Sequence, residues 1–339
     1  MGRFLIRRFL WMFVVLFVVS VITFVLMRLV PGGPFNNSER GVPEAVRRNI
    51  EAKYGLDQPL LNQYLKYIGD IVLPRITDET WRRSLTEDYL INIDLPFLGE
   101  DAAFRWMNFG PSLRNRSRTV NMIFTDNLPI SFQLGLAAMT VAMAIGIPAG
   151  IISALRRNTW VDYTGMGIAI VGVSIPVIIM GPILQYTFAV NLGIFRPTGW
   201  GTLDTMILPS FALGFAQSAL LARLTRASLL QVMNEDYIRT ARAKGLSERM
   251  VILFHALKNS LIPVVTVLGP LFAALLTGTF VTETIFGVPG MGRYFVTSVL
   301  NRDYPVIMGT ILLYAFCLVL ANTIVDIVYA WLDPRIRYD

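Results

Sequence analysis

NEDYIRTARAKGLSERMVILFHALKNSLIP, residues 234–263, is a basic and amphipathic stretch that lies between two strongly apolar segments. Asn234 is suited to cap a helix whose first turn then carries two acidic residues, where the helix dipole favours negative charge. Gly245 has the conformational freedom to end this helix in the left-handed conformation, and Ser247 is suited to cap a second helix. The stretch therefore predicts two short helices joined by a glycine elbow.

The second predicted helix has an apolar face. Its apolar side chains recur at a helical spacing, at Met250, Leu253, Phe254, Leu257 and Leu261. A short helix held beside a membrane in this way is suited to insertion into a groove on another protein. An ordinary amphipathic loop would show the same spacing, so spacing alone leaves both interpretations open.

The composition is that of a membrane protein. Of 339 residues, 54% are apolar and 16% are charged, whereas a soluble domain carries about 25% charged residues. The net charge of +7 could suggest nucleic-acid binding, but the basic residues cluster at the ends of apolar segments and not on one face. With one cysteine, Cys317, and one histidine, His255, the chain has no intrachain disulfide, multi-cysteine metal site or clustered-histidine zinc site.

Six apolar segments are long enough, or nearly so, to cross a membrane at about 20 residues each. The first runs from Phe9 to Met27, and the others cover roughly 129–155, 163–191, 206–223, 260–282 and 306–332. Four prolines within them predict kinks, namely Pro148, Pro176, Pro182 and Pro209. We therefore expect an all-α membrane protein with six transmembrane helices.

The chain divides into four parts in this interpretation. Residues 1–30 form the first transmembrane helix, and 31–127, with twelve basic and thirteen acidic residues, form a nearly neutral folded insert. Residues 128–333 form a core of five helices that includes the loop at 234–259, and 334–339 form a tail. Helical pieces are expected within the insert at 43–54 and 60–71, whereas the fold of 72–105 is left open.

Charge predicts that the N-terminus is cytoplasmic. With that orientation, fourteen Lys and Arg residues lie in the inside segments and three lie in the short outside loops. The long insert does not count, because long domains cross the membrane largely regardless of charge. Both termini and the loop at 234–259 are then cytoplasmic, and the insert is external.

The chain carries no motif for nucleotide hydrolysis. No glycine is followed by lysine, so a phosphate-binding loop is missing and we do not expect the chain to hydrolyse ATP itself. A membrane enzyme would need a nucleophile and a base at membrane depth, yet His255 lies in the predicted loop. A proton-coupled carrier would need a series of buried carboxylates, and we find only two candidates: Asp326 near the inner boundary, expected to bond with Asn322 or form an ion pair, and Glu283.

Polar residues within the spans could line a passage for a solute. They are Gln133, Ser174, Gln185, Gln217 and Thr277. Each could instead form hydrogen bonds between helices, which is the commoner role. Glu283, at the outer end of the fifth span and followed by glycine and proline turns, could shape an external gate or anchor a helix end.

Residues 236–245 and 255–259, together with Pro263, resemble the EAA loop of ABC-transporter permeases, in the form found in dipeptide and oligopeptide permeases. The general Glu-Ala-Ala of this loop is Arg239-Thr240-Ala241 here, and its Leu-Pro is Leu257-Lys258. The peptide-permease branch shows similar replacements. Further matches at 30–32, 109–112, 283–292, 302–305 and 326–337 extend the resemblance over nearly the whole chain.

This resemblance implies a B-type permease subunit with the type I ABC importer fold, in the cell membrane. It implies import of dipeptides or oligopeptides by alternating access, although related B-type subunits serve nickel chelates, sugars and other solutes. The implied partners are a homologous C-type permease, two ABC ATPases that use ATP and Mg²⁺, and an external solute-binding protein, while the chain itself binds no cofactor. The residues expected to couple it to the ATPases are Glu235, Asp236, Tyr237, Arg239, Ala241, Gly245 and His255.

Overall fold

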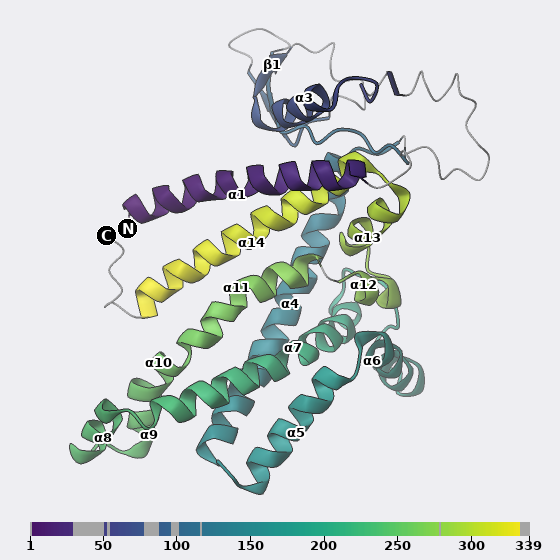
Figure 1. The fold of residues 1–339 in the computed structure, drawn as a ribbon. Helices are drawn as coiled ribbons and strands as arrows, with labels where there is room; N and C mark the ends of the chain where they lie inside the picture. Colours follow the sequence, from purple (N-terminus) through teal and green to yellow (C-terminus); the bar gives the residue numbers. More distant parts are fainter. Residues whose placement is uncertain are drawn as a thin grey trace. The chain divides into compact units, whose positions relative to one another are not determined.

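The computed structural model describes residues 2–29, 51–52, 55–77, 88–95, 102–115, 117–277 and 279–332 (Figure 1). The chain forms two compact units. The helical unit comprises Met1–Phe13, Ile130–Gly292 and Phe316–Asp339, and the insert unit comprises Val14–Pro129 and Arg293–Ala315. The predicted boundary at 127/128 falls within a helix, and the predicted tail at 334–339 lies outside the described residues.

Most of the described chain is helical. Four helices in the described part of the chain are long and apolar enough to cross a membrane: α1 (Gly2–Leu29), α4 (Val120–Leu155), α7 (Leu203–Val232) and α14 (Tyr304–Leu332). Up to six spans result among the described residues if each of two bent helix pairs counts as one span. These observations confirm the predicted class, a mostly helical membrane protein.

The first bent pair corresponds to the single apolar segment expected at 163–191. Helix α5 (Trp160–Ser174) is followed by α6 (Val177–Leu184) and the π-helical turn η3 (Gln185–Asn191), and the two halves differ in direction by 103°. Ile175 is extended, with φ −89° and ψ 111°, because the ring of Pro176 disfavours helical geometry in the residue before it. The predicted kink at Pro176 is thus confirmed, but it is a sharp break and not a gentle bend.

Helix α7 lies at the centre of the helical unit. Its buried residues Leu208, Ala212 and Leu213 pack with residues of α4 and of α11 (Ile262–Thr277) in one hydrophobic cluster. Gly146 and Gly150 of α4 allow close contact with α7, since an added Cβ would lie 2.5 Å from the carbonyl oxygens of Ser218 and Ala222 respectively. The small surface expected at 146–150 is therefore a helix contact.

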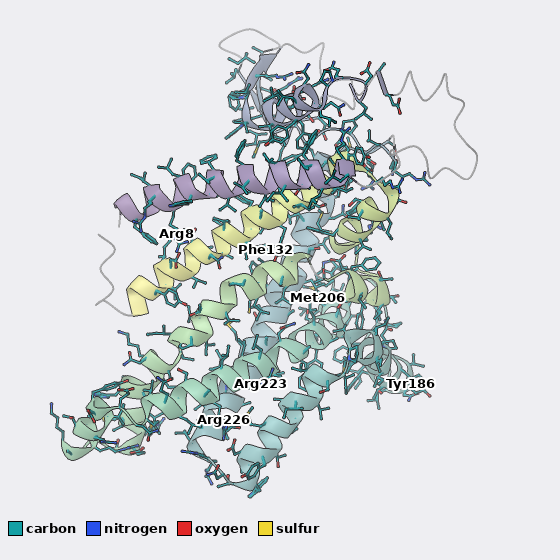
Figure 2. All side chains as sticks on the ribbon, viewed as in Figure 1. Arg8, Phe132, Tyr186, Met206, Arg223 and Arg226 are labelled. Carbon is teal, nitrogen blue, oxygen red and sulfur yellow. The ribbon has the colours of Figure 1, made fainter. Side chains whose placement is uncertain are left out.

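Helices α1 and α14 lie side by side within the helical unit (Figure 1). Arg8, labelled in Figure 2, forms an ion pair with Asp326 of α14. This confirms the ion pair expected as one possible role of Asp326. The pair satisfies a carboxylate that would otherwise be costly within an apolar helix.

The insert unit contains a small antiparallel sheet beside α3 (Leu60–Val72). The strands β1 (Arg75–Thr77), β2 (Ile91–Asp94) and β3 (Ala103–Trp106) are arranged in the order β1-β3-β2. Helix α3 confirms the helix predicted at 60–71, and the described part of 72–105 supplies strands of the sheet, whereas 78–87 and 96–101 lie outside the described residues. The helix predicted at 43–54 falls mostly outside the described residues.

Asp303 joins the segment after the sheet to the start of α14 within the insert unit. Its carboxylate accepts a hydrogen bond from the Ser112 hydroxyl. It also accepts bonds from the backbone N–H groups of Leu113, at 3.0 Å, and Arg114, at 3.3 Å. Two short motifs that lie far apart in the sequence, 109–112 and 302–305, thus meet at one buried carboxylate.

Candidate functional site

The stretch at 234–263 forms the predicted elbow. Helix α8 (Asp236–Ala243) is followed by Gly245, whose φ is +78°, and then by α9 (Glu248–Met250), the π-helical turn η4 (Val251–Ala256) and α10 (Leu257–Ser260). The left-handed conformation of Gly245 is as predicted. Nothing lies within 4 Å of an added Cβ at this position, so the requirement for glycine comes from the backbone and not from crowding.

The predicted capping at Asn234 is wrong by one residue. Glu235 is the N-cap of α8, and neither it nor Ser247 makes a side-chain capping bond. The Asn234 side-chain amide instead donates a hydrogen bond to the carbonyl of Leu230, at 2.9 Å, because Asn234 belongs to the turn that ends α7. Asn234 therefore terminates the helix before the elbow and does not start the one after it.

A hydrophobic cluster fixes the elbow to the ends of two long helices. Ile238 of α8, Val251 of η4 and Ala256 of η4 are all fully buried, and they pack with Leu229 of α7 and Ala154 of α4. Ala241, one of the predicted coupling residues, is also buried in this cluster. Its position assigns it to packing within the elbow, since no partner protein could reach its side chain there.

Two polar contacts join the halves of the elbow. Arg242 and Glu248 form a bidentate pair across Gly245, at 2.6 Å and 3.1 Å. The side-chain amide of Asn259 donates to the Tyr237 hydroxyl at 2.8 Å. These contacts and the cluster beneath them hold the two halves of the elbow together at the ends of α7 and α4.

The apolar face predicted on the second elbow helix points mainly to solvent. Met250, Leu253 and Phe254 are exposed, with Phe254 at 69%, while the fully buried positions are Val251 and Ala256. The reason is the π-helical turn, in which i→i+5 hydrogen bonds raise the number of residues per turn. Residues spaced three to four apart therefore no longer all lie on the buried side of the helix. These three side chains and the exposed Tyr237 of α8 are here called the elbow patch.

The other predicted coupling residues lie in the same elbow. Glu235, Asp236 and Arg239 are exposed on α8, where Arg239 lies 3.4 Å from Asp236. His255 is half-buried, and its ring Nδ1 lies 3.5 Å from the Met250 carbonyl oxygen. The elbow thus exposes both apolar and charged side chains, which are the two components of a protein interface.

Glu283 is buried at the centre of a second cluster. It lies in α12 (Phe280–Phe286), and its Oε1 accepts hydrogen bonds from the hydroxyls of Ser131, at 2.9 Å, and Thr279, at 2.5 Å. The Ser131 hydroxyl accepts in turn from the backbone N–H of Met291, at 2.7 Å. Glu283 and Ser131 therefore join α12, α4 and the turn before α13 (Gly292–Asn301).

Gly290 leaves the space that this carboxylate occupies. An added Cβ would lie 2.1 Å from Glu283 Oε1 and 2.6 Å from Ser131 Oγ. Gly290→Ala is therefore expected to destabilise the protein by about 1–3 kcal/mol, the usual range for overpacking. The measurement is the fraction of protein that stays monodisperse after heating in detergent.

Gly167→Ala is the matched control for this substitution. Gly167 lies in α5, and nothing is within 4 Å of an added Cβ. Alanine is the better helix former, so we expect this variant to be as stable as the parent or more so. Equal heat resistance of the two variants would contradict the role assigned to the Glu283 cluster.

The predicted passage residues are mostly engaged in local bonds. Gln133 accepts from the Trp200 indole at 3.3 Å, Ser174 donates within α5 at 2.8 Å, and Gln185 donates to the carbonyls of Pro197 and Ile285. Gln217 is half-buried on α7. The side chain of Thr277 lies outside the described residues. A role for any of these residues in a passage stays a prediction.

A buried ion pair near the elbow was not predicted from the sequence. Arg226 of α7 donates to both carboxylate oxygens of Asp162, each at 2.7 Å, and the Asn158 N–H donates to the same carboxylate at 3.0 Å. Figure 2 labels Arg226 on α7, beside the start of α5. The sequence did contain one signal for such a pair: Asp162 directly precedes an apolar segment, where an unpaired charge would be costly.

Comparisons with known proteins agree with the architecture. The family described as "Binding-protein-dependent transport system inner membrane component" matches residues 146–338, and the N-terminal part of such membrane components matches 1–84. The chain is 44% identical to the dipeptide transport system permease protein DppB of Bacillus subtilis, over 99% of this chain and 98% of that one. It is 41% identical to the oligopeptide transport system permease protein OppB of Salmonella typhimurium, and both chains are covered completely.

Solved structures show a similar fold. An inward-facing structure of the MetNI methionine ABC transporter has a TM-score of 0.52 at 17% identity, covering 62% of this chain and 96% of that chain. A second crystal form of the same transporter has a TM-score of 0.50 at 16% identity. At this level of identity the likeness concerns the fold alone.

Proposed function

Because the chain belongs to the family of binding-protein-dependent transport system inner membrane components, we propose that it is the permease subunit of an ATP-driven importer of dipeptides or oligopeptides. The observation that carries the substrate class is its identity of 40% or more, over essentially complete lengths, to curated dipeptide and oligopeptide permeases. As a membrane component of such a system it is not an enzyme and binds no cofactor. ATP hydrolysis and solute capture belong to the ATPase and binding-protein partners of the system.

The proposed assembly has four further subunits. A homologous permease completes the passage, two ATPases lie on the cytoplasmic side, and a solute-binding protein delivers the peptide from outside. The N-terminus and the elbow are cytoplasmic in this proposal, since fourteen basic residues then lie inside and three lie in the short outside loops. The insert is external and is available to the binding protein.

The elbow patch is the proposed ATPase-docking surface. Its apolar side chains, Tyr237, Met250, Leu253 and Phe254, are exposed, and the elbow that carries them packs against the end of α7. Glu235, Asp236 and Arg239 supply charged side chains in the same elbow, and Gly245 sets the direction of the second helix. Closure of the ATPases would move this surface and, with it, the transmembrane helices. The passage would then open first to one side of the membrane and then to the other.

Phe254→Asp is expected to separate the permease from its ATPase. Burial of an exposed aromatic side chain contributes roughly 1.5–3 kcal/mol, so its loss should weaken association about tenfold or more. The measurement is a pull-down of the tagged full chain from gently solubilised membranes, with mass spectrometry of the proteins that accompany it. Phe254→Leu keeps the apolar character and should retain the ATPase.

Two results would contradict these proposals. An unchanged amount of ATPase with Phe254→Asp would remove the elbow patch from the interface. A wild-type chain that came alone, even after cross-linking at the elbow, would contradict the assembly itself, and uptake driven by a proton gradient would then be tested. Screening the co-purified binding protein against peptides, nickel chelates and sugars tests the substrate class.

A further inference from the structure

The insert unit contains a partly open cavity that the transport proposal does not use. Its volume is about 510 Å³, and it lies between the end of α1, helix α3, the sheet and the start of α14. One part of its wall is apolar, formed by Phe24, Met27, Leu56 and Met308. The other part is polar and carries Arg28, Lys66, Tyr67, Asp70 and Arg75.

The polar wall has an excess of positive charge. Asp70 and Arg75 form an ion pair at 2.5 Å. Neither Arg28 nor Lys66 has a salt bridge to a carboxylate within the described part of the chain. Among the described lining residues, three cations (Arg28, Lys66 and Arg75) therefore face one carboxylate, that of Asp70.

Arg28 is held in place by neutral groups. Its guanidinium donates to the Gln63 side-chain oxygen, and it lies 4.8 Å from the ring centre of Tyr304 and 5.1 Å from that of Phe24. Its Nε is buried and has no hydrogen-bond partner among the described residues. An arginine positioned in this way, with a donor left over, is suited to bind an anion.

Tyr67 adds a second donor to the same wall. Its hydroxyl oxygen is buried and lacks a hydrogen-bond partner within the described ranges. Burial raises the pKa of the Tyr67 phenol well above its ordinary value, so the hydroxyl keeps its proton. The cavity thus offers an arginine, a lysine and a phenol as hydrogen-bond donors beside an apolar wall. Burying these donors without an acceptor costs free energy, which a bound anion would recover.

The position of the cavity favours an amphiphile. Arg28 lies in the last turn of α1, at the end of the candidate span Ile6–Leu29, which is the depth at which long basic side chains reach the lipid headgroups. We propose that the cavity binds one anionic phospholipid, with its phosphate at Arg28, Lys66 and Tyr67 and the start of an acyl chain along Phe24, Met27 and Met308. A free phosphate would leave this apolar wall in contact with water, and a neutral phospholipid would not balance the charge of Arg28 and Lys66.

The test uses the full chain in nanodiscs of phosphatidylcholine, with or without phosphatidylglycerol. Native mass spectrometry after transfer to detergent measures the lipid that stays bound. We expect one phosphatidylglycerol to be retained by the wild type and about tenfold weaker retention by Lys66→Gln and by Tyr67→Phe. These two variants are preferred to Arg28 substitutions, which would also remove the packing of that side chain on Phe24 and Tyr304.

Arg114→Gln is the control, because Arg114 is exposed in the same unit and does not line the cavity. It should retain phosphatidylglycerol as the wild type does. Equal retention by wild type, Lys66→Gln and Tyr67→Phe would overturn the proposal and identify the bound lipid as general boundary lipid. Inorganic phosphate added to phosphatidylcholine nanodiscs should not raise the thermal stability; a rise as large as that caused by phosphatidylglycerol would show that the site takes a free anion.

Discussion

Replacing Gly245 by valine is expected to lower ATP-driven uptake about tenfold or more while the protein still folds and enters the membrane. Gly245 has a φ of +78°, and a β-branched residue held in this region costs about 1–3 kcal/mol. The elbow relieves this strain by changing the direction of its second helix, which carries most of the elbow patch. The helical core below is unaffected, because no atom lies within 4 Å of the new Cβ. Uptake by the assembled transporter in proteoliposomes is the measurement.

Gly193→Val is the control that distinguishes loss of coupling at the elbow from a general effect of backbone strain. Gly193 has a φ of +62°, nothing lies near an added Cβ, and it is in a loop outside the elbow. The same strain should therefore leave uptake near the wild-type rate there. Gly245→Asn should keep most of the activity, since asparagine tolerates the left-handed conformation better than other residues with a side chain. Normal uptake by a well-expressed Gly245→Val variant would remove the elbow from the coupling mechanism.

The sequence was sufficient to predict the elbow because its strongest signals are local. A glycine between two helical patterns specifies a left-handed cap whatever surrounds it, and Gly245 has that conformation. The spacing of the second helix did not identify its fully buried residues, Val251 and Ala256, because the spacing rule assumes a regular α-helix. The π-helical turn at 251–256 shifts which side chains are buried, and nothing in the residue pattern specifies such a turn.

Contacts between distant segments could not be predicted in this way. Asp303 and Ser112 are separated by 191 positions, and Glu283 and Ser131 by 152, so no periodicity connects them. A single sequence does reveal that a carboxylate near an apolar segment needs a partner, and Arg8 confirmed this for Asp326. It does not reveal which partner, because that depends on how the helices pack.

Arg226→Met is expected to destabilise the protein strongly, because it leaves Asp162 buried without its partner. The Asp162 side chain is only 2% exposed, while Arg226 is 27% exposed. Breaking a fully buried pair costs on the order of 3–5 kcal/mol, and the partial exposure of Arg226 lowers the expected loss to roughly 2–4 kcal/mol. The measurement is the temperature at which half of the protein in detergent ceases to be monodisperse, with an expected fall of about 5–15 °C.

The double variant Asp162→Leu/Arg226→Met tests whether the unpaired charge causes the loss. Two apolar side chains in place of a buried pair are often tolerated, so the double variant should be more stable than Arg226→Met alone.

The exposed pair Arg242–Glu248, with side chains 41% and 56% exposed, is the control. Its disruption by Arg242→Met should cost no more than about 1 kcal/mol, because water replaces the lost partner. If Arg226→Met were as mild as Arg242→Met, water or lipid headgroups would have to reach Asp162, and α5 would be joined to α7 by apolar packing alone.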